Sequence, residues 1–331
     1  MGAVNQFYRY LRKHAGFLIF AIVAMTIPAY VGDAYYLSLL AFTATRFMMA
    51  LGLSLLLGQA GQISLGQAGF VGIGAYGSAI MTTRLGFDPW IAMVLAAVLS
   101  AAVAAVVGIP ALRLRGYYLA MATLGVNEII YLLLVRLKSL TNGTDGITGI
   151  PGLSFGALGL SGPKAYHLVA WGVALVMLRL SLNLSSSRVG RALRALSRSE
   201  AAAQSLGINV SYRKVQVFVM AAIFASIAGS FDAHYMRFVS PEAYTVTFSI
   251  ILITGVIIGG LGSLWGAVWG TLAIVILPEL LKRVHSDLTN LVFGVLLIAI
   301  MIFWQGRPRA LGPALEKWRK MIGGRIRRGA S

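Results

Sequence analysis

The sequence contains no cysteine among its 331 residues, which excludes disulfide bonds, thiolate metal sites and cysteine nucleophiles. Its four histidines, at positions 14, 167, 234 and 285, are too scattered to predict a histidine metal site. It also lacks the Gly-x-x-x-x-Gly-Lys-Ser/Thr motif that cradles ATP phosphates. We therefore expect no cofactor on this chain, and any ATP and Mg²⁺ must bind to partner subunits.

Charged residues are scarce as well, at 11% of the chain, whereas 58% of residues are hydrophobic. The mean hydropathy is +0.80, too apolar for a soluble core, so the composition predicts an integral membrane protein in a lipid bilayer. The net charge is +18. Because the basic residues flank apolar runs and no nucleic-acid-binding motif accompanies them, they indicate membrane orientation and no nucleic-acid partner.

Apolar runs of membrane-spanning length predict an all-α protein with about ten transmembrane helices in a single domain over residues 1–331. The predicted spans cover residues 15–31, 36–57, a third that opens at 58–77, 90–108, 117–135, 166–180, 215–235, 244–258, 267–281 and 288–304. Ten spans place the N-terminus, Arg113 with Arg115, and a basic tail over 305–331 on one side. The excess of lysine and arginine predicts that this side is cytoplasmic.

A basic segment over about 183–214 separates two hydrophobic halves. As a helix, its start would place Arg188, Arg191, Arg194 and Arg198 on one face and Val189, Ala192, Leu193 and Leu196 on the other. Ser197 and Glu200 match a capping box that would begin a second short helix through Ala201 and Ala202, ended by Gly207. The pattern fits a rigid knob or a helix lying on anionic headgroups.

The third predicted span opens with a glycine-rich stretch, GQAGQISLGQAGFVGIGAYG at 58–77. Gln59, Ser64 and Gln67 bring polar side chains to membrane depth there. Backbone that is not helical inside a membrane must be buried in protein or line a cavity. The stretch therefore predicts a broken helix or re-entrant turn; the alternative is close helix packing through small residues.

Two ionisable residues also fall inside predicted spans, Arg46 in the second and Glu128 in the fifth. Neither can face lipid without a large penalty. Either the two residues pair with each other or Glu128 lies near a polar pathway through the spans. Asp232, His234 and Glu279 lie near span ends, where we expect structural or interfacial roles.

Late in the chain, Gly262, Gly266 and Gly270 form a double small-xxx-small ridge that predicts close approach of two helix backbones. The ridge and the glycine-rich stretch at 58–77 occupy comparable places in the two halves. Paired interruptions of this kind occur in transporters built from internal repeats.

Motifs along nearly the whole chain also resemble LivM-type permeases, the membrane subunits of branched-chain amino-acid ABC importers. The resemblance is carried by Leu57–Gly61, Ser64–Ala68, Pro110–Gly116, Thr123–Gly125 with Glu128, Gly190–Ala195, Ala201–Asn209, His234–Tyr235, Val239–Pro241, Gly259–Gly266 and Pro278–Leu281. It implies a type II-like importer permease in a bacterial inner membrane with both termini cytoplasmic. Its partners would be a second, similar permease, two ATPase subunits and a periplasmic solute-binding protein.

The resemblance further implies that the knob is a coupling helix that docks into a groove on the ATPase. We expect the apolar face to fit that groove and the arginines to steer docking. A bulky charged residue at Ala202 or proline at Gly207 should then leave the permease folded and abolish coupling. Arg46 is not typical of the family, and similar permeases also carry urea, short amides or aromatic acids, so these solutes stay open.

Two other classes fit less well. An ion-coupled secondary transporter would need a relay of carboxylates or histidines along its spans, where only Glu128 is clearly placed. An intramembrane enzyme would need a nucleophile with a base, or a metal cluster, and the sequence offers neither pattern.

Overall fold

The computed structural model describes residues 2–153, 162–282 and 294. The chain divides into two compact units, 1–272 and 273–331. Every interaction discussed below lies within the first unit. The predicted tenth span, 288–304, and the basic tail over 305–331 lie outside the described residues, apart from residue 294 on the span itself.

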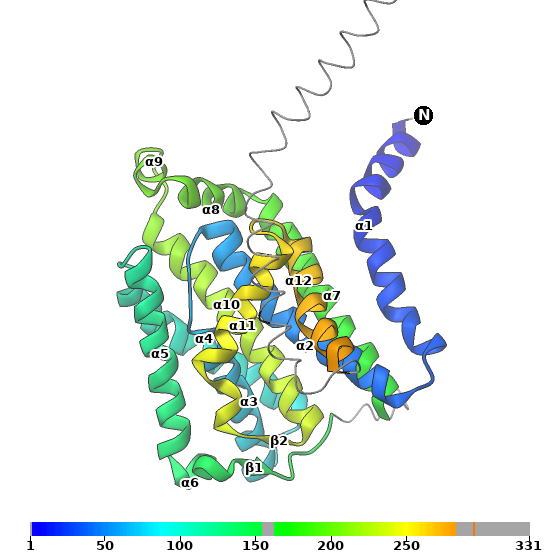
Figure 1. Cartoon of the computed structure of the whole chain (residues 1–331). Coiled ribbons are helices and arrows are strands. Elements are labelled where there is room, and N and C mark those ends of the chain that lie inside the picture. Colours follow the sequence, from blue (N-terminus) through cyan, green and yellow to red (C-terminus); the bar gives the residue numbers. More distant parts are fainter. Residues whose placement is uncertain (1, 154–161, 283–293, 295–331) are drawn as a thin grey trace, which may run out of the picture. The chain divides into compact units, whose positions relative to one another are not determined.

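Helices dominate the described chain (Figure 1). In order they are α1 Gly2–Tyr30, α2 Ala34–Leu53 with a π-helical turn η1 Ser54–Gln59, α3 Gln67–Arg84, α4 Pro89–Ala111, α5 Tyr117–Arg136, α6 Lys138–Thr141, η2 Gly143–Asp145, α7 Gly162–Ser186, α8 Arg188–Arg198, α9 Glu200–Ser205, α10 Val210–Met236, η4 Pro241–Tyr244, α11 Val246–Gly259 and α12 Leu264–Lys282. Two short strands, β1 Ile147–Thr148 and β2 Phe238–Val239, pair antiparallel.

Each of the first nine predicted spans overlaps one of these helices; in order, the helices are α1, α2, α3, α4, α5, α7, α10, α11 and α12. Among the described residues, five helical stretches are long and apolar enough to cross a membrane by themselves: α2 continued through η1, α4, α5, α7 and α10. This confirms an all-α multi-pass membrane protein. The one departure among the described residues is the β1–β2 pair, a two-stranded sheet that joins two loops.

The third predicted span begins later than expected, because α2 continues into η1 as far as Gln59. The chain is then non-helical from Gly61 to Gly66, and α3 begins at Gln67. Figure 1 shows this segment running alongside α2 from the α8 end toward α3. The predicted break in the helix is confirmed.

The spans have two distinct ends (Figure 1). The turn at 112–116, α8 and α9 lie at one end, and α6, β1 and β2 lie at the other. At that other end, Arg84 donates to the Ser139 carbonyl and, at 3.1 Å, to Asn142 Oδ1. His234 Nδ1 lies 2.7 Å from the Pro151 carbonyl, which fastens the β1 loop to α10.

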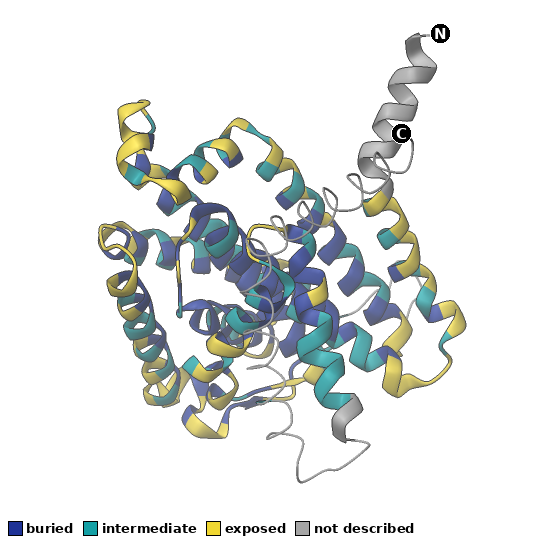
Figure 2. Cartoon of the chain, turned by 45° about the horizontal axis from the view of Figure 1, so that its top comes forward, coloured by how far each residue is buried: buried dark blue, intermediate teal, exposed yellow. Residues whose placement is uncertain are grey.

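Helix α10 is the centre of the core and packs on α2, α3 and α4. Its buried positions run along almost its whole length, as the dark blue central helices of Figure 2 show. Small residues allow the close approach: a Cβ on Gly74 would overlap the Ser226 backbone, and one on Gly229 would overlap the Val71 carbonyl. Helices in lipid associate through such packing because burial from water supplies no driving force between them.

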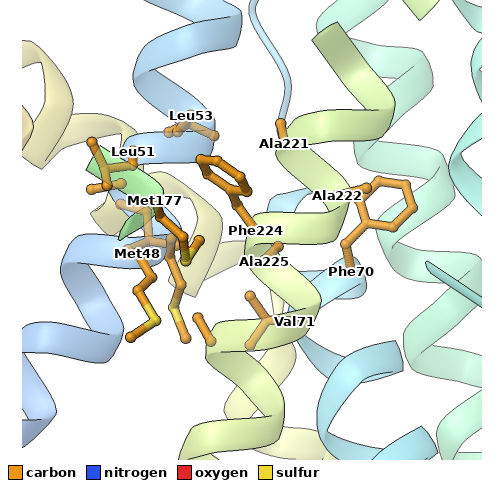
Figure 3. Packing of buried hydrophobic residues seen from close by; sticks show 14 of the residues in the cluster. Met48, Leu51, Leu53, Phe70, Val71, Met177, Ala221, Ala222, Phe224 and Ala225 are labelled. Atoms are coloured by element: carbon orange, nitrogen blue, oxygen red, sulfur yellow. The ribbon is translucent and has the colours of Figure 1, made fainter. Parts of the chain in front are cut away.

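Larger side chains fill the remaining space (Figure 3). Met48 and Leu51 from α2 and Met177 from α7 pack on the Phe224 side of α10, and Phe70 from α3 packs on the other side. Close packing through small residues, the alternative reading of the glycine-rich stretch, is therefore also correct for Gly74.

Candidate coupling site

Helices α8 and α9 are separate short helices, and each begins after a serine N-cap. Ser187 caps α8, and its hydroxyl accepts from the Gly190 amide at 3.3 Å. Ser199 adopts an extended backbone, φ −161° and ψ 114°, and accepts from the Ala202 amide to begin α9. The predicted capping residue was wrong by two positions, since the Ser197 hydroxyl instead donates back to the Arg194 carbonyl.

Gly207 ends this region with a left-handed backbone, φ +77°, and its amide donates to the Gln204 carbonyl at 2.9 Å. Proline has a φ near −65° and no amide hydrogen. The expectation that proline at Gly207 would leave the fold unchanged is therefore wrong.

The apolar face of α8 is buried within this chain rather than offered to a partner. Leu193 packs in the main core, and Leu196 packs in a small cluster with Ala203 and Val210. The prediction that this face fits a groove on another protein is contradicted, because the side chains that would fill the groove already cover the ends of the spans. The arginine side of α8 and the outer side of α9 stay exposed, including Leu206 at 77%.

The side chain of Gln59, buried at the end of η1, joins three other segments. Its Oε1 accepts from Arg194 Nη1 of α8 and from the Ser185 hydroxyl of α7, each at 3.1 Å. Its Nε2 donates to the Gly262 carbonyl at 3.0 Å, in the turn between α11 and α12. Arg194 also donates to the Ser185 carbonyl at 2.7 Å. One amide therefore links the ends of α2, α7 and α11 to the basic helix.

Glycines make this junction compact. A Cβ on Gly58 would lie 2.9 Å from the Gly262 nitrogen, so the two glycine-rich interruptions predicted from the sequence contact each other directly. Gly61 has φ +66°, and a Cβ there would lie 3.1 Å from the Ser197 side chain of α8. Any larger residue at either position would push these segments apart.

A second junction forms around Glu200, the first residue of α9. Its Oε2 receives Arg115 Nε at 2.8 Å, from the turn before α5, and its Oε1 receives Lys214 Nζ at 2.5 Å, from α10. Lys214 is only 4% exposed at its side chain, whereas Arg115 is 66% exposed. The Lys214 pair is thus the buried one, and Glu200 ties α9 to both α5 and α10.

Between the two junctions lies a cavity of about 340 Å³. Its lining includes Gln62, Leu119, Ser197, Arg198 and Lys214. Gly61 and Gln62, at the start of the non-helical segment, thus face the same cavity as residues of α8 and α9.

Comparisons with known proteins identify the family of the chain. Residues 35–301 match the family model described as "Branched-chain amino acid transport system / permease component". The chain belongs to this family. It is 32% identical over 308 residues to the high-affinity branched-chain amino acid transport system permease protein LivM of Salmonella typhimurium, covering 86% of this chain and 72% of the relative.

Two further relatives of the permease are more distant. The ribose import permease protein RbsC of Escherichia coli is 28% identical over 247 residues, 73% of this chain and 74% of RbsC. LivH of Escherichia coli, also a high-affinity branched-chain amino acid permease protein, is 30% identical over 138 residues, 40% of this chain and 44% of LivH. No solved structure matches the chain.

The other polar residues predicted in the break are buried in the permease and hold the non-helical segment in place. Ser64 and Gln67 are both buried, and Gln67 Nε2 donates to the Ala221 carbonyl of α10 at 3.1 Å. The backbone amide of Leu65 donates to Thr123 Oγ1 of α5 at 2.9 Å. Side-chain acceptors thus satisfy non-helical backbone at membrane depth, as a membrane interior requires.

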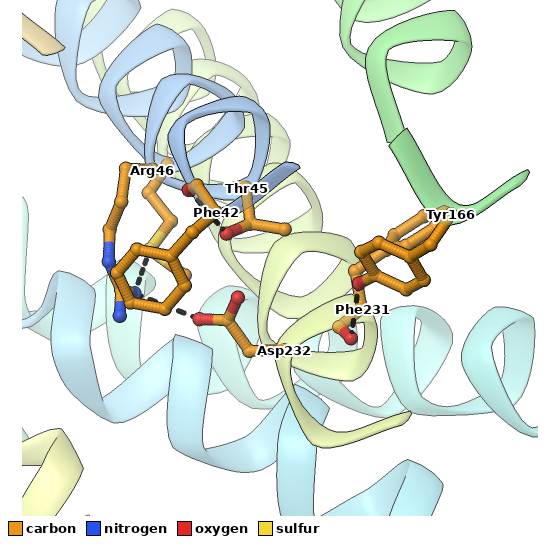
Figure 4. A network of polar contacts seen from close by, with 7 residues as sticks. Phe42, Thr45, Arg46, Tyr166, Phe231 and Asp232 are labelled. Atoms are coloured by element: carbon orange, nitrogen blue, oxygen red, sulfur yellow. Dashed lines mark hydrogen bonds and ion pairs between the residues drawn. The ribbon is translucent and has the colours of Figure 1, made fainter. Parts of the chain in front are cut away.

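Arg46 does not pair with Glu128, so that alternative is wrong. The other alternative, a place for Glu128 near the translocation pathway, stays a prediction. Arg46 Nη1 lies 2.8 Å from Asp232 Oδ2 of α10 (Figure 4). Glu128 is half-buried on α5 and has no hydrogen bond or ion pair within the described part of the chain. The sequence predicts only that Asp232 lies near a span end, and no pattern in it indicates that the carboxylate turns toward α2.

The sequence did not single out Ser185 or Lys214, although both complete the junctions around Gln59 and Glu200. Both contacts arise only because the folded chain brings distant residues together; Ser185, for example, is 126 residues from Gln59. Within the described ranges no group of three or more histidine, aspartate and glutamate side chains could hold a metal ion.

Proposed function

We propose that this permease is one membrane subunit of an ATP-driven ABC importer that carries branched-chain amino acids across a bacterial inner membrane. The family match over 35–301 and the identity to LivM support this solute. The sequence contains no ATP-binding motif, so the energy must enter through another protein.

The proposed assembly contains a second, similar permease, two ATPase subunits and a periplasmic solute-binding protein. The partial identity to LivH, which is named as a permease of the same kind of system, supports a permease pair. The end of the spans that carries α8 and α9 is cytoplasmic in this proposal. Arg113, Arg115 and the arginines of α8 gather at that end, in accordance with the positive-inside rule. Both termini are proposed to lie on the same side.

The observation that carries the proposal is the connection of α8 and α9 to the spans through Gln59 and Glu200. An ATPase that closes on ATP can move the spans only through a rigid contact. Arg194 joins α8 to the ends of α2, α7 and α11 through Gln59. Glu200 joins α9 to α5 and α10. A displacement of α8 and α9 would therefore reach five spans.

The docking face follows from what remains exposed. Since Leu193 and Leu196 are buried in this chain, the ATPase would contact the outer side of α9 with the arginine side of α8. Ala201, Ala202 and Leu206 lie on that exposed surface. The arginines would orient docking, and the small apolar patch on α9 would supply the close contact.

The test is co-purification of the complex followed by reconstitution in proteoliposomes. Ala202→Arg should leave the permease inserted but reduce retention of the ATPase and abolish ATP-driven leucine uptake. Leu140→Arg, a substitution of another exposed residue on α6 at the other end of the spans, is the matched control for ATPase retention and should retain it.

Two results would contradict the proposal. One is wild-type uptake in Ala202→Arg. The other is accumulation of solute by the permease alone on an ion gradient, which would support a secondary transporter instead.

A further inference from the structure

The ion pair between Arg46 and Asp232 has no part in the coupling junctions, and its geometry leaves binding groups unused. It joins α2 to α10 within the spans (Figure 4). Arg46 Nη1 donates to Asp232 Oδ2 at 2.8 Å and to Met49 Sδ at 3.4 Å. Within the described residues, Nε and Nη2 of the same guanidinium make no hydrogen bond. Three N–H donors therefore remain on one charged group.

The carboxylate is likewise half used. Asp232 Oδ1 is buried and has no hydrogen-bond partner in the described part of the chain. The neighbouring Thr45 hydroxyl, which lies close to the carboxylate, donates to the Phe42 carbonyl at 2.9 Å. A purely structural pair at this depth would be expected to satisfy both groups, because unsatisfied polar atoms in a low-dielectric interior are costly.

Two aromatic rings hold the guanidinium in position. The Arg46 guanidinium carbon lies 4.0 Å from the centroid of the Phe42 ring and 4.6 Å from that of Phe248 on α11. Rings packed on its faces leave the edge of the planar group for new hydrogen bonds, and that edge matches a carboxylate in a bidentate arrangement. The side chains of Arg46 and Asp232 stay 19% and 12% exposed, so the pair is not sealed in the core, although Oδ1 itself must be uncovered before a solute can reach it.

We propose that Arg46 and Asp232 form a binding site within the spans for the charged end of an α-amino acid. Arg46 takes the carboxylate of the solute and the free oxygen of Asp232 takes its ammonium group. This inference rests on the proposed function and adds a recognition step inside the membrane. A zwitterion fits because its carboxylate can accept from the unused N–H groups of Arg46 and its ammonium group can donate to the unused oxygen of Asp232.

The test is binding of labelled leucine to the detergent-purified complex in the absence of the solute-binding protein. Unlabelled leucinamide lacks the carboxylate and 4-methylpentanoate lacks the ammonium group. In the wild type, each should compete at least tenfold more weakly than leucine. Arg46→Gln should weaken leucine binding at least tenfold and lose its preference over leucinamide, and Asp232→Asn should lose the preference over 4-methylpentanoate.

Arg179→Met is the matched control, since that arginine lies on α7 with its guanidinium carbon 5.7 Å from the Phe17 ring centroid. It should bind leucine as the wild type does. The exchange Arg46→Asp with Asp232→Arg keeps an ion pair but reverses it, so leucine binding should stay lost.

Several outcomes would overturn the site. They are restored leucine binding in the exchanged variant, equal competition by leucine and both analogues in the wild type, or no saturable leucine binding to the wild-type complex. The analogue comparison needs no variant and so does not depend on whether the variants fold. Failure of the proposed function is distinct, because it would appear as absent ATP-driven uptake by the complete wild-type system.

Discussion

Arg194 on α8 donates to the side-chain amide of Gln59 at 3.1 Å, although the two residues are 135 positions apart. The same amide oxygen accepts from Ser185, and the amide nitrogen donates to the Gly262 carbonyl. A basic helix at the end of the spans is thereby connected to three helix ends through one buried side chain.

This connection predicts that Gln59→Leu uncouples transport from ATP hydrolysis. The leucine fills similar space but cannot bond Arg194 or Gly262, so α8 would move without moving the spans. We expect leucine uptake in proteoliposomes to fall at least tenfold while basal ATP hydrolysis persists. Gln216→Leu is the control, because that amide accepts one bond from Arg213 nearby on α10. Normal uptake in Gln59→Leu would contradict the role of this junction.

The Glu200 junction predicts that substitutions of Glu200 and of Arg115 lower the stability of the permease by unequal amounts. Lys214→Met leaves Glu200 with the exposed Arg115, but Glu200→Gln leaves Lys214 as a buried charge without its partner, 4% exposed. Breaking a buried pair from one side costs about 3 kcal/mol, so Glu200→Gln should clearly lower the unfolding temperature. Arg115→Gln should cost less than about 1 kcal/mol, because that arginine is largely in water.

The measurement is thermal unfolding of the detergent-purified permease complex. The double change Glu200→Gln with Lys214→Met should recover most of the lost stability, because no buried charge is left alone. An equal loss for Arg115→Gln and Glu200→Gln would show that burial of Lys214 is not the deciding factor.

The α11–α12 turn predicts a folding defect for Gly266→Leu. A Cβ at Gly266 would lie 2.7 Å from the Gly260 carbonyl oxygen and would also overlap Gly259, and one at Gly270 would overlap the Gly255 carbonyl. These contacts are with backbone, which cannot rotate away, so the helices must separate. Detergent-extracted yield and melting temperature should both fall.

Gly125→Leu provides the comparison for that change, since a Cβ at Gly125 on α5 meets no atom within 4 Å. It should be extracted in normal yield. If Gly266→Leu were extracted equally well with an unchanged melting temperature, close packing at the ridge would be refuted.

The last prediction distinguishes the two carboxylates that could pair with Arg46. A double-mutant cycle with Arg46→Met and Asp232→Leu should give a coupling free energy above about 1 kcal/mol, because each single change strands a buried charge. A cycle of Arg46→Met with Glu128→Leu should give a value near zero. Coupling to Glu128 alone would contradict the observed pairing.

Local sequence features predicted much of the architecture. Apolar run length gives the spans because every backbone group in lipid must be bonded within its own segment. Serine and glycine placed α8 and α9 between two spans, although the capping residue is Ser199 rather than Ser197. The helix break before Gln67 and the close packing at Gly266 also followed from residue type, since glycine alone permits such backbone contacts.

Only the tertiary structure decided which polar groups meet. The sequence placed Glu128 inside a predicted span and Asp232 near the end of another, and the packing of α10 on α2 brings Asp232 to Arg46. The sequence likewise predicted an amphipathic α8, but only the structure shows that Leu193 is buried against the spans and that the arginine side stays exposed. The reason is physical: spans and caps depend on interactions between neighbours in the chain, whereas these contacts depend on how distant helices rotate to fill a shared core.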